Sequence, residues 1–218
     1  MATLSAMVKP ESAAGAPVTV KVRRTQVERR AHTRAALIDS AVACVNAVGA
    51  ASVTTAQVAA RAGVTRGAVQ HHFRSPEELY LALVDHAWQE IVRTCEGAPG
   101  PDVPLARRIA DWGATLVDAF TSPAALAGYE ILMYYRGSAG FVAAHTPITL
   151  AAEQRLDDRW LAAFADTGLS TKRLVYVRHT ARTFMLGAIA RGLIVPGTDG
   201  DLRGEVVDLI RAFLPDRT

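Results

Sequence analysis

Apolar residues recur at helical spacing along most of the chain, and no segment alternates with the two-residue period of a strand. Capping residues, prolines and glycines mark where these helical segments begin and end. The pattern predicts about nine helices, which begin near Thr33, Thr54, Thr65, Ser75, Pro104, Ser122, Thr146-Pro147, Ser170 or Thr171, and Asp201. The sequence therefore predicts an all-α protein.

Composition agrees with this pattern. The 218 residues include 40 alanines, the best helix formers, and only 6% aromatic residues. Half of the residues are apolar, which excludes a globally disordered chain, yet no apolar run is long enough to span a membrane. Cys44 and Cys95 have neither metal-site nor disulfide-framework spacing. We therefore expect a cytoplasmic protein without a bound metal, a cofactor or a membrane partner.

Charge is distributed unevenly along the chain. Residues 1–75 carry a net charge of +7, and residues 76–218 carry −4. A basic first third suggests contact with a polyanion, although a solvated tail would also explain the charge. Residues 1–30 lack a sustained period and are predicted to form a disordered basic arm. The basic stretch from Lys21 to Arg34 is either solvated or touches the phosphate backbone or minor groove of DNA.

Two short helices joined by residues 62–64 form a helix-turn-helix pattern over residues 54–73. Gly63 can adopt the left-handed backbone conformation that the tight turn requires. Val69 and Phe73 of the second helix are predicted to be buried. The opposite, outward face consists of Arg66, Gly67, Gln70 and His71. A core needs none of these residue types there, whereas all of them suit DNA bases and phosphates.

The segment Thr54–Phe73, and more loosely residues 31–91, resembles the DNA-binding domain of the TetR (tetracycline-repressor) family of bacterial transcription regulators. The matching features are Thr54-Thr55, Val58-Ala59, Ala62-Gly63-Val64, Arg66-Gly67, His71-His72-Phe73 and Ser75-x-Glu77-Glu78-Leu79. The resemblance implies an N-terminal three-helix DNA-binding domain at residues 31–91. It also implies a C-terminal helical domain at residues 92–218 that binds an effector and forms a dimer.

The resemblance further implies which residues contact the double-stranded DNA operator. Carried over position by position, they are Thr54, Thr55, Thr65, Arg66, Gly67, Ala68, Gln70, His71 and Arg74. Two positions depart from the family pattern. Gln70 stands where tyrosine is common and offers a base-reading amide instead. Pro76 stands where lysine is common, so Arg74 or the basic arm would supply the lost phosphate contact.

The C-terminal half carries aromatic and methionine side chains at helical spacing. Such residues more often form a core than a pocket, but the resemblance implies a small apolar or aromatic effector in this domain. The predicted pocket residues are Trp112, Phe120, Tyr129, Met133, Trp160 and Phe164. A ligand among them would act on the DNA-binding domain through the long helix Pro76–Cys95.

The last two predicted helices, Thr171–Leu193 and Asp201–Leu214, each carry an apolar stripe. Two such hairpins can form a four-helix interface, so we expect a homodimer with Phe184 and Val206 in the interface.

The leading hypothesis is a repressor that a small-molecule effector releases from a palindromic operator. The alternative is a DNA-binding activator or architectural protein without an effector. A small helical enzyme is disfavoured, because the sequence lacks a nucleophile elbow, a phosphate-binding loop, a dinucleotide-binding glycine motif and an H-E-x-x-H motif.

Overall fold

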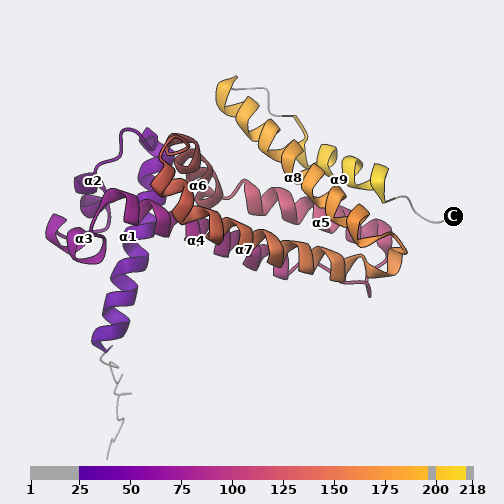
Figure 1. The fold of residues 1–218 in the computed structure, drawn as a ribbon, viewed down its shortest axis with the longest axis horizontal. Coiled ribbons are helices and arrows are strands. Elements are labelled where there is room, and N and C mark those ends of the chain that lie inside the picture. Colours follow the sequence, from indigo (N-terminus) through magenta and orange to yellow (C-terminus); the bar gives the residue numbers. More distant parts are fainter. Residues whose placement is uncertain (1–24, 196–199, 215–218) are drawn as a thin grey trace, which may run out of the picture.

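The computed structural model describes residues 25–195 and 200–214. Within these ranges the chain forms nine α-helices and no strand (Figure 1). The helices are α1 (Gln26–Val48), α2 (Thr55–Arg61), α3 (Arg66–His72), α4 (Pro76–Glu96), α5 (Leu105–Phe120), α6 (Pro123–Tyr134), α7 (Ala139–Ala163), α8 (Thr171–Ile194) and α9 (Leu202–Phe213), with one 3-10 turn, η1 (Ala165–Thr167), after α7. The predicted all-α fold is confirmed. None of these helices is both long and apolar enough to cross a membrane.

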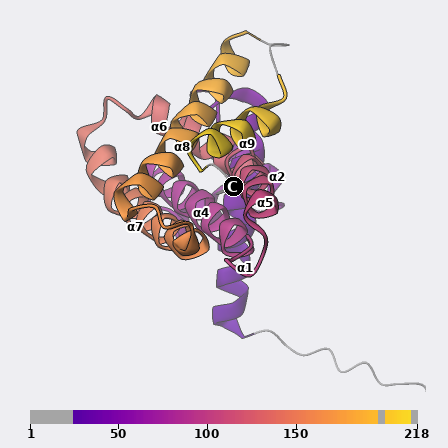
Figure 2. The same cartoon turned by 90° about the vertical axis from the view of Figure 1, so that its right-hand side faces the viewer.

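Helices α1, α2 and α3 lie together at one end of the molecule, and the antiparallel pair α8 and α9 lies toward the other (Figure 1). Helix α4 is the central element, because it packs against α1, α5, α6 and α7 (Figure 2). The expected domain boundary between residues 91 and 92 falls inside this continuous helix. Helix α4 therefore belongs to both parts of the molecule.

The predicted start of the first helix near Thr33 is wrong, because α1 begins at Gln26. The Thr25 side chain accepts the backbone N–H of Glu28, and the Glu28 carboxylate accepts the N–H of Thr25 at 2.7 Å. This reciprocal capping box stabilises the additional helical turns. Residues 26–30, expected in the disordered arm, are thus helical, and residues 1–24 lie outside the described part of the chain.

The predicted helix start at Thr146-Pro147 is also wrong. Helix α7 begins at Ala139, capped by the Ser138 side chain, and runs through Pro147. A proline inside a helix lacks the N–H that would bond one turn back and favours a kink or a break, yet α7 continues past Pro147 to Ala163. The ring of Phe141, in the first turn of α7, stacks on Tyr135 with centroids 4.4 Å apart, which anchors the helix N-terminal to the proline.

Candidate DNA interface and ligand cavity

Helices α2 and α3 form the predicted helix-turn-helix. Thr54 caps α2 through a reciprocal capping box with Gln57, and the Thr65 side chain caps α3. Gly63 in the turn has a φ of 67°, the left-handed conformation that the turn requires. The apolar side chains that fix these helices against the core are buried: Val58, Ala59, Val69 and Phe73. Local sequence signals thus set the orientation of α3.

The predicted DNA-contacting residues occupy one surface of this unit. Thr55 and Ala68 are half-buried, and the other seven are exposed: Thr54, Thr65, Arg66, Gly67, Gln70, His71 and Arg74. A groove of about 160 Å³ at the start of α4 is lined by Thr55, Arg66, Gln70 and Arg74, among others. The Thr54 hydroxyl is engaged in the α2 cap, which leaves the neighbouring Thr55 hydroxyl for an outside partner. Contact of this surface with DNA stays a prediction.

The cationic side chains at this end have no acidic partner among the described residues. Arg29, Arg30, Arg34, Arg61, Arg66 and Arg74 are absent from every ion pair of residues 25–195 and 200–214. Partial burial lowers the pKa of His72, and the positive charges of His71, Arg30 and Arg34 lower it further. The surface therefore carries unpaired positive side chains, as a polyanion partner would require.

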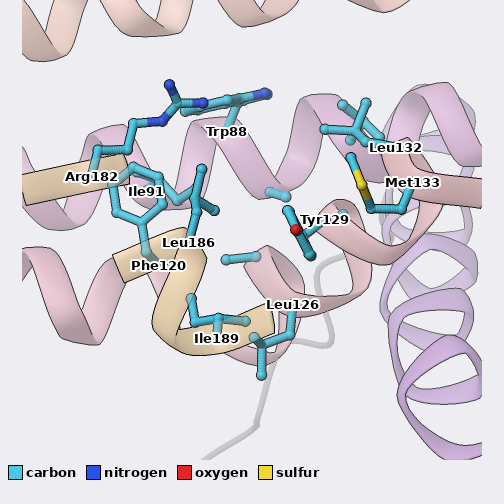
Figure 3. A pocket seen from close by; sticks show the side chains of 14 residues that line it. Trp88, Ile91, Phe120, Leu126, Tyr129, Leu132, Met133, Arg182, Leu186 and Ile189 are labelled. Atoms are coloured by element: carbon cyan, nitrogen blue, oxygen red, sulfur yellow. The ribbon is translucent and has the colours of Figure 1, made fainter. Parts of the chain in front are cut away.

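An apolar cavity of about 190 Å³ lies between α4, α6 and α8 (Figure 3). Helix α4 contributes Trp88 and Ile91, and α8 contributes Leu186 and Ile189. Three predicted pocket residues also line it: Phe120, Tyr129 and Met133. An apolar protein cavity of about 150 Å³ is large enough to bind benzene. The cavity can therefore hold a molecule built on a single ring.

The other three predicted pocket residues do not line this cavity. Trp112, Trp160 and Phe164 are fully buried and pack on one another, with ring centroids 5.3 Å apart for the two tryptophans and 4.3 Å for Trp160 and Phe164. The two indole N–H groups donate to the backbone carbonyls of Pro99 and Leu174. Helical spacing correctly places these rings on inward faces, but it does not distinguish a solid aromatic core from a cavity wall.

Among the described residues that line the cavity, Arg182 on α8 is the one with a charged side chain. Its Nε lies 2.9 Å from a Glu153 carboxylate oxygen, and its guanidinium lies 5.7 Å from the centre of the Trp88 ring. Figure 3 shows this guanidinium beside Trp88 at the cavity edge. Its two terminal amino groups form no hydrogen bond within the described residues. The described residues that line the cavity therefore offer the N–H donors of Arg182 and include no carboxylate. Sequence reasoning missed Arg182 and Trp88, because only the placement of α8 beside α4 brings them together.

Helix α6 links the cavity directly to the DNA-binding end. It lines the cavity through Tyr129 and Met133. Between these residues, Glu130 accepts the backbone N–H of Ala50, in the loop that follows α1, at 2.7 Å. The Asn46 side-chain amide of α1 also donates to the carbonyl of Pro123 at 2.9 Å. Sequence reasoning assigned this linkage to α4 alone, and nothing local to Glu130 identifies a partner 80 residues away.

Comparisons with known proteins agree with this geometry. The model of the family described as "Bacterial regulatory proteins, tetR family" matches residues 37–83. The HTH-type transcriptional regulator CymR of Pseudomonas putida is 41% identical over 69 residues, which are 32% of this chain and 34% of CymR. The chain thus spans about a third of that relative's length. The uncharacterized HTH-type transcriptional regulator TtgW, also of Pseudomonas putida, is 35% identical over 115 residues, 51% of this chain and 80% of TtgW.

Solved structures extend the likeness to the whole fold. A TetR-family transcriptional regulator from Mesorhizobium loti superposes with a TM-score of 0.70 at 13% identity, covering 85% of this chain and 96% of its own. The multidrug binding protein EbrR, solved in complex with imidazole, has a TM-score of 0.60 at 18% identity over 85% of this chain and 96% of its own. Solved structures at such low identity establish the fold alone. The TtgW match, together with the matched helix-turn-helix segment, shows that the chain belongs to the TetR family of bacterial regulatory proteins.

Proposed function

We propose that this protein is a homodimeric transcriptional repressor that binds a palindromic operator and releases it when a small molecule enters the cavity. One observation carries the proposal: an exposed surface of unpaired cations is joined by two helices, α4 and α6, to an apolar cavity. Residues 31–91 would form the DNA-binding domain and residues 92–218 the effector-binding and dimerisation domain, with α4 shared between them.

In the proposed complex, α3 enters the major groove with its exposed face toward the bases. Arg66 suits guanine or a phosphate, and the Gln70 amide can pair with the N6 and N7 atoms of adenine. Gly67 and Ala68 allow a close approach, since neither carries a long side chain. Thr54, Thr55, Thr65, His71 and Arg74 lie around this face and would hold the phosphates that set its register.

The proposed dimer forms through α8 and α9. On α8, Tyr176 and Phe184 keep 53% and 36% of their surface exposed in the protomer, which suits them to an interface. Val206, expected in the interface together with Phe184, is fully buried inside the protomer and is corrected to a core residue. A two-fold dimer presents two copies of α3, so the operator should be palindromic, with half-site centres spaced by about 34–36 Å per DNA turn.

The effector proposed for the cavity is a single-ring molecule with an oxygen acceptor, such as an aromatic carboxylate. The apolar walls favour the ring, and the free N–H groups of Arg182 favour an acceptor over a cation. Such a ligand would separate α4, α6 and α8 and displace both helices that contact the DNA-binding end. The operator binds only one spacing of the recognition helices, so the displaced state would lose affinity.

The proposal is tested by thermal-shift assays and operator titration with three matched probes: 4-ethylbenzoate, 4-ethylbenzyl alcohol and 4-ethylbenzylamine. We expect the carboxylate to stabilise the protein most and to lower operator affinity by about 5–150-fold, the usual range of allosteric coupling. Arg182→Gln should remove the preference for the carboxylate, and Lys172→Gln, an exposed change on the same helix, should keep it. Stabilisation by a probe without any change in operator affinity would contradict the proposed release.

A further inference from the structure

We propose that Thr149 on α7 is a positioning residue of the cavity. Its hydroxyl holds the indole of Trp88 in one orientation at the cavity wall, and this makes the cavity prefer an aromatic ring to a saturated ring of similar size and the same charge. The inference rests on the effector site proposed above and deepens it by naming what selects the ring. Thr149 is not among the described residues that line the cavity, so it acts through Trp88.

Thr149 differs from other threonines inside helices in the partner of its hydroxyl. A threonine hydroxyl in a helix commonly bonds to a backbone carbonyl three or four residues earlier. Six helical threonines of the described chain donate to the carbonyl four residues earlier: Thr33, Thr94, Thr115, Thr146, Thr180 and Thr183. Thr149 forms no such bond among the described residues, and its Oγ1 accepts the indole N–H of Trp88 at 3.1 Å. Its hydroxyl is therefore committed to α4 rather than to its own helix.

The first turns of α7 fix the position of this hydroxyl. The Nδ1 atom of His145 lies 3.4 Å from the Thr149 Oγ1. In the tautomer whose Nδ1 carries no proton, the hydroxyl donates to His145 while its oxygen accepts the indole N–H. The His145 ring in turn lies 5.8 Å from the ring of Phe141, which stacks on Tyr135. Thr149 is thus held by its own surroundings and can restrain Trp88.

Trp88 is restrained by side chains from three other helices. Besides Thr149 of α7, the Phe120 ring of α5 meets the indole at an interplanar angle of 87°, with centroids 6.2 Å apart. The Arg182 guanidinium of α8 lies 5.7 Å from the indole centre, and Figure 3 shows these two side chains together on one side of the cavity. Phe120 and Arg182 also line the cavity, whereas Thr149 contacts the indole from outside it. The indole therefore forms a cavity wall of fixed orientation.

A fixed aromatic wall treats aromatic and saturated rings differently. Aromatic rings attract one another beyond the effect of buried area, but only in edge-to-face or offset arrangements. An aromatic ligand can form such an arrangement with a fixed Trp88, next to the edge-to-face pair that Trp88 already forms with Phe120. A Trp88 ring that is free to turn offers mainly apolar area, which serves both kinds of ring equally. Loss of the Thr149 hydroxyl should therefore reduce the preference between rings.

The first test compares two carboxylates, 4-ethylbenzoate and trans-4-ethylcyclohexanecarboxylate, by calorimetric titration. We expect wild type to bind the aromatic probe about 2–10-fold more tightly, the range of one added aromatic pair. Thr149→Val keeps the β-branched shape without the acceptor, and its ratio should fall toward one. Thr149→Ala should show the same loss, and Thr149→Ser, which retains a hydroxyl, should keep the wild-type ratio. Thr146→Val is the matched control, because the Thr146 hydroxyl bonds within α7, and it should also keep the ratio.

A second measurement follows the indole N–H groups of the unliganded protein in a proton–nitrogen correlation spectrum, with Trp88→Phe to assign the Trp88 signal. Thr149→Val should move that signal and speed its exchange with water, while the signals of Trp112 and Trp160 stay in place. An unmoved Trp88 signal, or a wild-type preference between rings in both Thr149→Val and Thr149→Ala, would overturn the inference and leave the proposed effector site intact. Failure of both probes to bind wild type would overturn the proposed effector site and, with it, the selectivity assigned to Thr149.

Discussion

The two ends of the molecule differ in how many of their arginines form ion pairs. In residues 25–75, six arginines have no carboxylate partner. In residues 76–195 and 200–214, seven of the twelve arginines form ion pairs: Arg107, Arg108, Arg155, Arg178, Arg182, Arg203 and Arg211. Five of these seven arginines pair with an acidic residue of another element, and Arg107 and Arg211 pair within their own helix. Unpaired charges of one sign are available to an outside partner. The difference indicates that the first end is built for association and the second for internal packing.

The largest expected effect concerns a buried pair of the second end. Arg178 is 1% exposed and contacts Glu153 at 2.7 Å and Asp157 at 2.6 Å. Arg178→Ala would leave two carboxylates without this partner, and such a loss in a buried site costs about 3–5 kcal/mol of the free energy of unfolding. Chemical denaturation measures it. Arg66→Ala should leave that free energy within about 0.5 kcal/mol of wild type, since it is an exposed change. A similar decrease in the free energy of unfolding of both variants would contradict the proposed difference between the two ends.

The next effect concerns base reading. Gln70 is exposed on α3, and its side-chain amide forms no hydrogen bond within the described residues. Gln70→Ala should weaken operator binding by about 1–3 kcal/mol for the base pair that it reads in each half-site. Gel-shift titration against operator variants should show relaxed preference at that one position. Equal affinity of Gln70→Ala and wild type for every variant would exclude Gln70 as a base-reading residue.

A smaller effect is expected where the two ends are coupled. Glu130→Ala removes the acceptor of the Ala50 N–H but leaves the cavity lining in place. The factor by which 4-ethylbenzoate lowers operator affinity should therefore shrink, by up to about tenfold for a coupling of about 1.4 kcal/mol. Asp158→Ala, an exposed loss of a carboxylate on α7, provides the control. If Glu130→Ala responds to the ligand as fully as wild type does, the hydrogen bond between Glu130 and Ala50 does not carry the coupling.

The smallest effect is a dependence on pH. Partial burial and neighbouring positive charges lower the pKa of His72 in the free protein, and an operator phosphate held by the adjacent His71 would raise it again. Operator binding should therefore take up protons, so affinity should rise several-fold from about pH 8 to about pH 6, and His72→Gln should flatten that rise. Because folding lowers this pKa, the unfolded chain binds the proton more readily, and the His72 contribution to stability falls as pH drops below about 6.5.

The DNA-binding end could be predicted from sequence because its signals are local. Capping residues, the left-handed Gly63 and helical period determine which side chains of α3 face outward. The Thr25-x-x-Glu28 capping box is also a local signal for the start of a helix. The first turns of α1 nevertheless have no apolar stripe before Leu37, so helical periodicity does not identify them. Periodicity alone predicts a disordered arm there.

The cavity could be predicted only in part, because its walls come from helices far apart in sequence. Phe120, Tyr129 and Met133 have the same helical spacing as Trp112 and Trp160, and only packing separates wall from core. Arg182 reaches the cavity by the placement of α8 beside α4. No pattern along a single helix carries that information.

The central claim is that the unpaired cationic end recognises a specific DNA sequence as a two-fold dimer. Selection of binding duplexes from a random pool, followed by affinity measurement at a fixed ionic strength of about 0.15 M, the physiological value, tests it most directly. We expect a palindromic consensus that the protein binds at least about 10³-fold more tightly than a scrambled duplex of the same length and composition. Equal affinity for the selected and scrambled duplexes would contradict it.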